Sequence, residues 1–159
     1  MTSNSAGRPF AARLADCKPS IEVTAWRLIA GEECYFTGNA ELLRSAIENV
    51  IRNAVRYTAE HTAVEVTLHC SSAGGDSANI TIGVRDYGKG VPEEALAEIF
   101  RPFYRVADAR DRQTGGTGLG LAIAERAVRL HGGTAQAANA NEGGLIVKLT
   151  LPELPIPVA

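Results

Sequence analysis

The chain has 159 residues, of which 45% are hydrophobic and 21% charged, and these proportions are typical of one soluble globular domain. Its net charge of −2, from 16 basic and 18 acidic residues, offers no electrostatic argument for binding nucleic acid or an anionic membrane. The sequence contains no apolar run of ~18 residues and no signal-peptide core. We interpret Cys17, Cys34 and Cys70, which form no Cys-x-x-Cys pair, as reduced thiols of a cytoplasmic protein without a metal or catalytic role.

The first part of the chain predicts a flank followed by one long helix. Residues 1–8 are small and polar, residues 10–17 suggest a short helix, and residues 21–29 and 34–37 suggest a hairpin around Ala30-Gly31-Glu32. Asn39 occupies the position of a helix N-cap. From residue 40 to residue 58, apolar side chains recur with helical spacing, and we expect one buried face made of Leu42, Leu43, Ala46, Ile47, Val50, Ile51, Ala54 and Tyr57.

Alternating patterns then predict strands that frame a second helix. Residues 64–70 and 80–84 alternate in polarity on either side of a polar turn at residues 71–77, and residues 134–138 and 145–151 follow as two closing strands. Between these pairs, Leu119, Ile123, Ala127 and Leu130 indicate a helix that ends at Gly132-Gly133. This order predicts an α+β fold: a two-layer sandwich with a mixed, mainly antiparallel sheet and helices on one face.

A loop of about thirty residues, at positions 87–117, interrupts this pattern. Loops longer than roughly 12–15 residues are uncommon in compact domains unless they act as lids or binding loops. The glycines at both ends allow positive φ or a close approach to a ligand. Pro92 favours a short helix inside the loop, and Phe100, Phe103 and Tyr104 suit anchors onto the domain.

Polar residues on the long helix form the first candidate site. Asn53 lies at the edge of the apolar face, and Asn49 and Arg56 lie one turn away on either side. Amide oxygens suit a hard cation such as Mg²⁺, and an arginine suits phosphate. A solvated polar seam is the alternative. Glu48 and Arg52, on the opposite flank, suggest a solvated ion pair.

Asp86 and the second glycine cluster complete the candidate site. Asp86 continues the inward face of the strand at 80–84, so its carboxylate needs donors, such as a planar base with an exocyclic amine or, alternatively, its own loop in an Asx turn. Residues 115–120 open a helix, where backbone N–H groups can bind phosphate, although such a stretch is equally consistent with a flexible hinge. His61, His69 and His131 have no ligand-spaced partners.

In combination, these segments resemble the catalytic and ATP-binding domain of sensor histidine kinases, which has the Bergerat (GHKL) fold. Residues 48–58 resemble the N box, 86–92 the first glycine box, 100–105 the F box and 116–123 the second glycine box. Four boxes in this order are far more specific than any one of them. The stretch from residue 101 to residue 123 is most similar to envelope-stress sensor kinases of the CpxA type.

The resemblance implies a domain at residues 20–153, with an ATP lid at about 87–117, a flank at 1–19 and a tail at 154–159. It implies that Asp86 binds the adenine amino group and that Asn53 coordinates Mg²⁺, with Asn49 supporting the phosphates. These two asparagines would be the catalytic residues. The other implied contacts to ATP are Arg56, Tyr57, Gly88, Gly90, Arg105, Gly116, Thr117, Gly118, Leu119 and Gly120.

The resemblance also implies a phosphotransfer role in a two-component signalling system. Asn49 stands where ATPases of this superfamily carry a general-base glutamate, so hydrolysis should be slow and the γ-phosphate should go to a histidine on a separate dimerisation domain. No His-Glu-x-x-[ST]-Pro motif occurs here. We therefore expect the cytoplasmic piece of an inner-membrane kinase that cannot phosphorylate itself and serves a response regulator indirectly. A nucleotide-binding regulatory module and a GHKL-type serine kinase are the alternatives.

Overall fold

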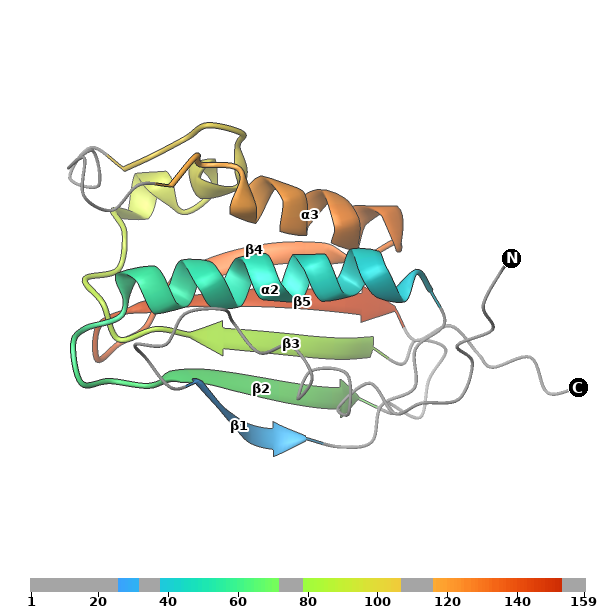
Figure 1. Cartoon of the computed structure of the whole chain (residues 1–159), viewed down its shortest axis with the longest axis horizontal. Coiled ribbons are helices and arrows are strands. Elements are labelled where there is room, and N and C mark those ends of the chain that lie inside the picture. Colours follow the sequence, from blue (N-terminus) through green and yellow to red (C-terminus); the bar gives the residue numbers. More distant parts are fainter. Residues whose placement is uncertain (1–25, 32–37, 72–78, 107–115, 153–159) are drawn as a thin grey trace, which may run out of the picture.

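A computed structural model describes residues 26–31, 38–71, 79–106 and 116–152 (Figure 1). The expected helix at 10–17, the flank and the tail lie outside these residues, as does most of the polar turn at 71–77. The described elements are β1 (Trp26–Gly31), α2 (Ala40–Tyr57), β2 (Val64–Ser71), β3 (Asn79–Arg85), the 3₁₀ turns η1 (Glu93–Ala95) and η2 (Glu98–Phe100), α3 (Gly120–Leu130), β4 (Thr134–Asn139) and β5 (Leu145–Pro152).

The strands form one sheet in the order β1-β2-β3-β5-β4. The pairs β2–β3, β3–β5 and β4–β5 are antiparallel, and β1 pairs with β2 in parallel. Helices α2 and α3 form the second layer (Figure 1). The predicted two-layer α+β architecture, with its mixed and mainly antiparallel sheet, is confirmed.

The core lies between the helices and one face of the sheet, because alternate strand residues point to opposite faces. Val66 pairs with Val84, and Ile82 pairs with Leu68 and Leu149, so apolar side chains meet across the strands. The fully buried core residues include Ile51 and Val50 from α2, Val128 from α3, and Val64, Val66, Leu68, Ile80, Ile82, Val84, Leu149 and Leu151 from the sheet.

Helices α2 and α3 are tied together where α2 begins and α3 ends. The Asn39 side chain accepts hydrogen bonds from the backbone N–H groups of Glu41 and Leu42, so the predicted N-cap is confirmed. The backbone N–H of Asn39 donates to Nε2 of His131 (3.1 Å), whose Nδ1 lies 2.7 Å from the Ala127 carbonyl oxygen. Because Nε2 accepts, the proton of this ring is on Nδ1 and is donated to Ala127.

The expected hairpin near residue 31 is wrong in its described part. Ala30 and Gly31 are strand residues rather than turn residues, and they pair with Thr67 and Leu68 of β2. The proposed second arm at 34–37 lies outside the described residues. Parallel pairing across this distance in sequence leaves no local turn signal, which explains the error.

Both helices bury a slightly different face from the one predicted. Leu42 and Tyr57, expected in the core, are each 39% exposed at the two ends of α2. On α3, Ile123 and Leu130 are exposed, whereas Leu121, Ala124, Ala127 and Val128 are buried. The small alanines allow α3 to pack closely on α2, and this close packing determines the buried face.

Two smaller expectations were also wrong. Cys70 is disulfide-bonded rather than reduced, with its partner cysteine outside the described residues. Glu48 and Arg52 form no ion pair; the ion pairs among the described residues are Arg85–Glu142, Arg101–Glu98 and Arg129–Glu125. None of the described helices is long and apolar enough to cross a membrane.

Adjacent glycines in the β4–β5 turn offer a matched test of backbone packing. Gly143 and Gly144 have φ values of 91° and 92°, so alanine at either position costs about 1–2 kcal/mol in backbone strain. A Cβ on Gly143 would lie 3.8 Å from the Gly88 carbonyl oxygen, whereas one on Gly144 would overlap the carbonyl of Asp86. We expect Gly144→Ala to lower the free energy of unfolding by about 1–3 kcal/mol more than Gly143→Ala in urea denaturation. Equal losses would contradict this packing.

Candidate functional site

Asp86 is the one buried charged residue among the described residues, with a relative exposure of 3%. It follows β3 directly, and its Oδ1 accepts hydrogen bonds from the N–H groups of Gly88 (2.9 Å) and Leu145 (3.2 Å). The bond from Gly88 is the expected Asx turn, and the bond from Leu145 ties the carboxylate to the start of β5. Oδ2 has no hydrogen-bond partner among the described residues, so one carboxylate oxygen stays available to a ligand.

The environment of Asp86 acts on its charge in two directions. Burial raises the pKa of the carboxyl group above its ordinary value of 3.8, because the charged form loses hydration. The two backbone N–H bonds and the nearby Arg85 guanidinium pull the pKa back down. Arg85 lies 4.5 Å from the centre of the Tyr87 ring and 3.7 Å from Glu142, so its charge is shared with other partners. A buried carboxylate whose desolvation is only partly compensated is typical of a functional site.

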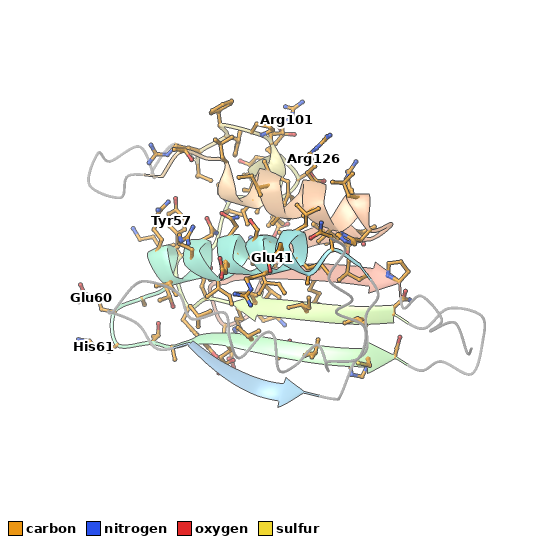
Figure 2. All side chains as sticks on the ribbon, turned by 45° about the vertical axis from the view of Figure 1, so that its right-hand side comes forward. Glu41, Tyr57, Glu60, His61, Arg101 and Arg126 are labelled. Atoms are coloured by element: carbon orange, nitrogen blue, oxygen red, sulfur yellow. The ribbon has the colours of Figure 1, made fainter. Side chains whose placement is uncertain are left out.

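The predicted polar site residues of α2 differ in exposure, and Asn49 lies against Gly120 at the start of α3. Asn49 and Asn53 are half-buried, and Arg56 and Tyr57 are exposed. Nδ2 of Asn49 donates to the Ser45 carbonyl oxygen (2.8 Å), which orients the amide and leaves Oδ1 facing Gly120. The Asn53 amide makes no hydrogen bond to a described residue. Figure 2 shows Tyr57 projecting from α2 on the side away from the sheet.

Three glycines bring separate segments against α2. A Cβ on Gly88 would overlap the Tyr57 carbonyl oxygen, and a Cβ on Gly116 would overlap the Arg56 guanidinium. A Cβ on Gly120 would lie 3.3 Å from Oδ1 of Asn49. At Gly88 the overlap is with backbone, so only glycine permits that approach, and Gly116 and Gly120 lie close to side chains of α2. The Asp86 loop and the amino-terminal end of α3 therefore both reach the same helix.

The remaining predicted site residues divide into two groups. Gly118, with φ of 74°, lies against Phe103, and its carbonyl accepts a hydrogen bond from the Phe103 N–H (3.0 Å), so the two arms of the long loop meet here. Thr117 and Leu119 flank it at the start of α3. Gly90 packs against Asn139 of β4, and Arg105 is half-buried in the described part of the long loop.

Three groups that shape this site were not predicted from the sequence. The backbone N–H of Leu145 holds Asp86, the Thr58 hydroxyl accepts from the Tyr87 N–H (3.0 Å), and the Asn139 amide bonds to Val91. Thr58 could have been noticed as the polar residue that ends α2. The other two groups act across sequence separations of 59 and 48 residues, and no local pattern indicates such contacts.

No group of three or more His, Cys, Asp or Glu side chains that could hold a metal ion occurs among the described residues. Mg²⁺ does not require such a cage, because it commonly keeps several waters and takes one or two protein oxygens together with substrate phosphates. The half-buried Asn53 amide, without a hydrogen bond to a described residue, fits such a single ligand.

Comparisons with known proteins identify the relatives of this arrangement. The sequence profile of the family "Histidine kinase-, DNA gyrase B-, and HSP90-like ATPase" matches residues 38–155. The sensor histidine kinase CpxA of Escherichia coli (strain K12) is 49% identical over 115 residues, which cover 72% of this chain and 24% of CpxA. The chain thus spans about a quarter of that relative's length.

Solved structures agree with the sequence comparison. The mycobacterial sensor histidine kinase MprB superposes with a TM-score of 0.69 and 25% identity, covering 84% of each chain. The ATP binding domain of PrrB from Mycobacterium tuberculosis superposes with a TM-score of 0.66 and 29% identity, covering 91% of this chain and 90% of that one.

The raised pKa of Asp86 predicts how its charge affects stability. The folded state binds the proton more tightly than the unfolded state, so this contribution to stability is present below pH 3.8 and is lost as the pH rises through the folded-state pKa. Asp86→Asn removes the buried charge and keeps an oxygen for the Gly88 and Leu145 N–H groups. We therefore expect its melting temperature at neutral pH to equal or exceed that of the unsubstituted chain, with the difference vanishing at acid pH.

The exposed Glu60 provides the control for this measurement, because Glu60→Gln removes a solvated carboxylate and should leave the melting temperature unchanged at both pH values. A clear loss of stability in Asp86→Asn at neutral pH would mean that the ionised carboxylate stabilises the fold.

Proposed function

The chain belongs to the family of histidine kinase-, DNA gyrase B- and HSP90-like ATPases, and we propose that it binds Mg²⁺–ATP and supplies the γ-phosphate to a histidine of a sensor kinase. The observation that carries this proposal is the convergence of a buried carboxylate, a polar helix face and a glycine-rich helix start on one side of α2. The similarity to CpxA along 72% of the chain supports a kinase rather than another branch of the family.

Each part of the site suits one part of the nucleotide. Oδ2 of Asp86, which has no hydrogen-bond partner in the described part of the chain, can accept a hydrogen bond from the exocyclic amine of adenine. A guanine base carries a carbonyl at that position and offers no such donor. The backbone N–H groups around Gly118 and Gly120, at the positive end of α3, suit the phosphates. Arg56 lies against Gly116 and adds a positive charge at the same place. Tyr57 and Arg105 remain proposed contacts to the sugar or the phosphates.

The metal would be held by one protein group. Asn53 would supply an amide oxygen to the metal. Asn49, whose amide is oriented by its bond to the Ser45 carbonyl oxygen, would support the phosphates. A bound Mg²⁺ neutralises phosphate charge during transfer. The residues of this chain then orient the triphosphate, and Gly118 and Phe103 bring the two arms of the lid together.

The amide at position 49 favours transfer to a protein over hydrolysis. An amide cannot take a proton from water at neutral pH, so it cannot act as a general base. In the proposed reaction, a nitrogen of the accepting histidine attacks the γ-phosphorus, the bond to the bridging oxygen breaks, and ADP leaves. The acceptor would lie on a separate dimerisation domain, and a response regulator would receive the phosphoryl group afterwards.

Calorimetric titration of Mg²⁺–ATP tests the binding step. We expect saturable binding to the unsubstituted chain and an affinity at least about tenfold lower for Asp86→Asn, because a hydrogen bond to a charged acceptor contributes about 1.5–3 kcal/mol. Glu60→Gln should bind as the unsubstituted chain does. Equal affinity of the Asp86→Asn variant would remove Asp86 from the adenine contact, and absence of binding by the unsubstituted chain would contradict the proposal.

Phosphotransfer in trans tests the catalytic step. With radiolabelled ATP, we expect no stable label on the chain alone, but label on an added histidine-bearing dimerisation domain of a CpxA-type kinase. Asn53→Ala should abolish this label, and the exposed Arg52→Ala should retain it. ATP binding without any transfer would favour a regulatory module, and label on serine would favour a serine kinase.

A further inference from the structure

The side-chain amide of Asn139 bonds in both directions to the backbone of Val91. The Val91 N–H donates to Oδ1 of Asn139 (2.9 Å), and Nδ2 of Asn139 donates to the Val91 carbonyl oxygen (2.6 Å). A longer contact of 3.5 Å joins Nδ2 to Oε1 of Glu93. Donor and acceptor of one side chain thus reproduce the pair of bonds that a neighbouring strand would make.

These bonds lie at the point where the long loop leaves the sheet. The last backbone bond to β5 before the loop is from the Asp86 N–H to the Leu145 carbonyl oxygen (3.0 Å). After Val91, Pro92 has no N–H to donate, and its carbonyl accepts from the N–H of Ala95, the last residue of η1 (2.9 Å). Among the described residues, both hydrogen bonds of the Val91 backbone go to Asn139.

Gly90 adapts the backbone to this anchor. Its φ of 72° lies in the left-handed region, and a Cβ there would lie 2.6 Å from Oδ1 of Asn139. A glycine is therefore needed at position 90 both for the positive φ and to leave room for the side-chain amide of Asn139. The requirement connects the first glycine box to β4, a strand that contributes none of the predicted contacts to ATP.

We propose that Asn139 is a positioning residue that sets the direction in which the lid leaves the sheet, and that it thereby maintains nucleotide affinity. The inference rests on the proposed binding of ATP between Asp86 and the start of α3. Asn139 does not line that region itself: it holds Val91, five positions after Asp86, and Val91 leads into η1 and η2. The bonds from the Tyr87 N–H to the Thr58 hydroxyl and from the Gly88 N–H to Asp86 Oδ1 hold residues 86–88, which precede Val91.

A purely local role in the β4–β5 turn is the competing explanation. The neighbouring Asn141 distinguishes the two, because it is exposed in the same turn and makes no hydrogen bond to a described residue. Asn141→Ala is therefore the matched control for Asn139→Ala.

The experiment combines calorimetric titration of Mg²⁺–ATP with amide hydrogen exchange of the nucleotide-free chain. If the segment that begins at Val91 is correctly oriented only a fifth to a tenth of the time without Asn139, the dissociation constant of Asn139→Ala for Mg²⁺–ATP rises about fivefold to tenfold. Exchange should accelerate within residues 91–100 and stay unchanged in α2 and β5. Asn141→Ala should match the unsubstituted chain in both measurements.

Asn139→Asp tests the hydrogen bond that Nδ2 of Asn139 donates to the Val91 carbonyl oxygen. It retains an acceptor for the Val91 N–H but places a carboxylate oxygen against the Val91 carbonyl and near Glu93, so we expect affinity no better than that of Asn139→Ala. Three results would each overturn the inference. The first is full affinity in Asn139→Asp, and the second is an affinity of Asn139→Ala within about twofold of that of the unsubstituted chain. The third is faster exchange that spreads through α2 and β5. If the unsubstituted chain fails to bind ATP, the proposed function fails, and unchanged exchange at residues 91–100 in Asn139→Ala would separately refute the anchor.

Discussion

The burial of one carboxylate at the end of an apolar strand is the constraint on which the rest of this site depends. Asp86 extends the same face of β3 that carries Ile80, Ile82 and Val84 into the core. A charge in that position is costly unless donors surround it. The donors come from the chain itself, from the Gly88 N–H and the Leu145 N–H, and both bond to the same oxygen. The two N–H groups therefore partly offset the desolvation of the Asp86 carboxylate through Oδ1, and Oδ2 remains for a ligand.

That requirement explains several details of the surrounding backbone. Leu145 can reach Oδ1 only because Gly144 passes directly over the Asp86 carbonyl, where a Cβ would not fit. Gly88 can turn back to Asp86 only because it packs on the last carbonyl of α2. The Thr58 hydroxyl then holds Tyr87 between them. The loop after β3 is thus fitted to β5 on one side and to α2 on the other.

Sequence patterns predicted most of the elements because the signals are local. The helical spacing of residues 40–58, the N-cap at Asn39 and the alternation of β2, β3 and β5 each lie within one element. The structure has the predicted helix, cap and strands, with Leu42 and Tyr57 exposed at the two ends of the helix. The inward orientation of Asp86 followed from the same alternation. The burial of Asp86 and the half-buried Asn53 agree with this prediction, whereas the ligand contacts of both remain predictions.

The incorrect predictions concern features that are determined by contacts between segments far apart in the sequence. Pairing of β1 with β2 joins segments more than thirty residues apart, and nothing near Gly31 indicates it. Helix α3 has apolar residues on two sides, so its spacing alone could not reveal that Ala124 and Val128 face the core and Ile123 does not. The anchoring of Val91 by Asn139 was hidden for the same reason, because Asn139 looked like an ordinary turn residue.

The hydrogen bond from the Asn39 N–H to His131 Nε2 has a consequence for the electrostatic field near the site. It places the start of α2 beside the end of α3, and Gly120 beside Asn49 and Gly116 beside Arg56 complete an antiparallel pair (Figure 1). Antiparallel helices have opposed dipoles, so the negative end of α2 lies next to Gly88 and Asp86, while the positive end of α3 opens a short distance along α2. Under the proposed function, a nucleotide between these ends lies in the gradient of electrostatic potential to which both helix ends contribute. This gradient favours a nucleotide whose amine points to the end of α2 and whose phosphates point to the start of α3.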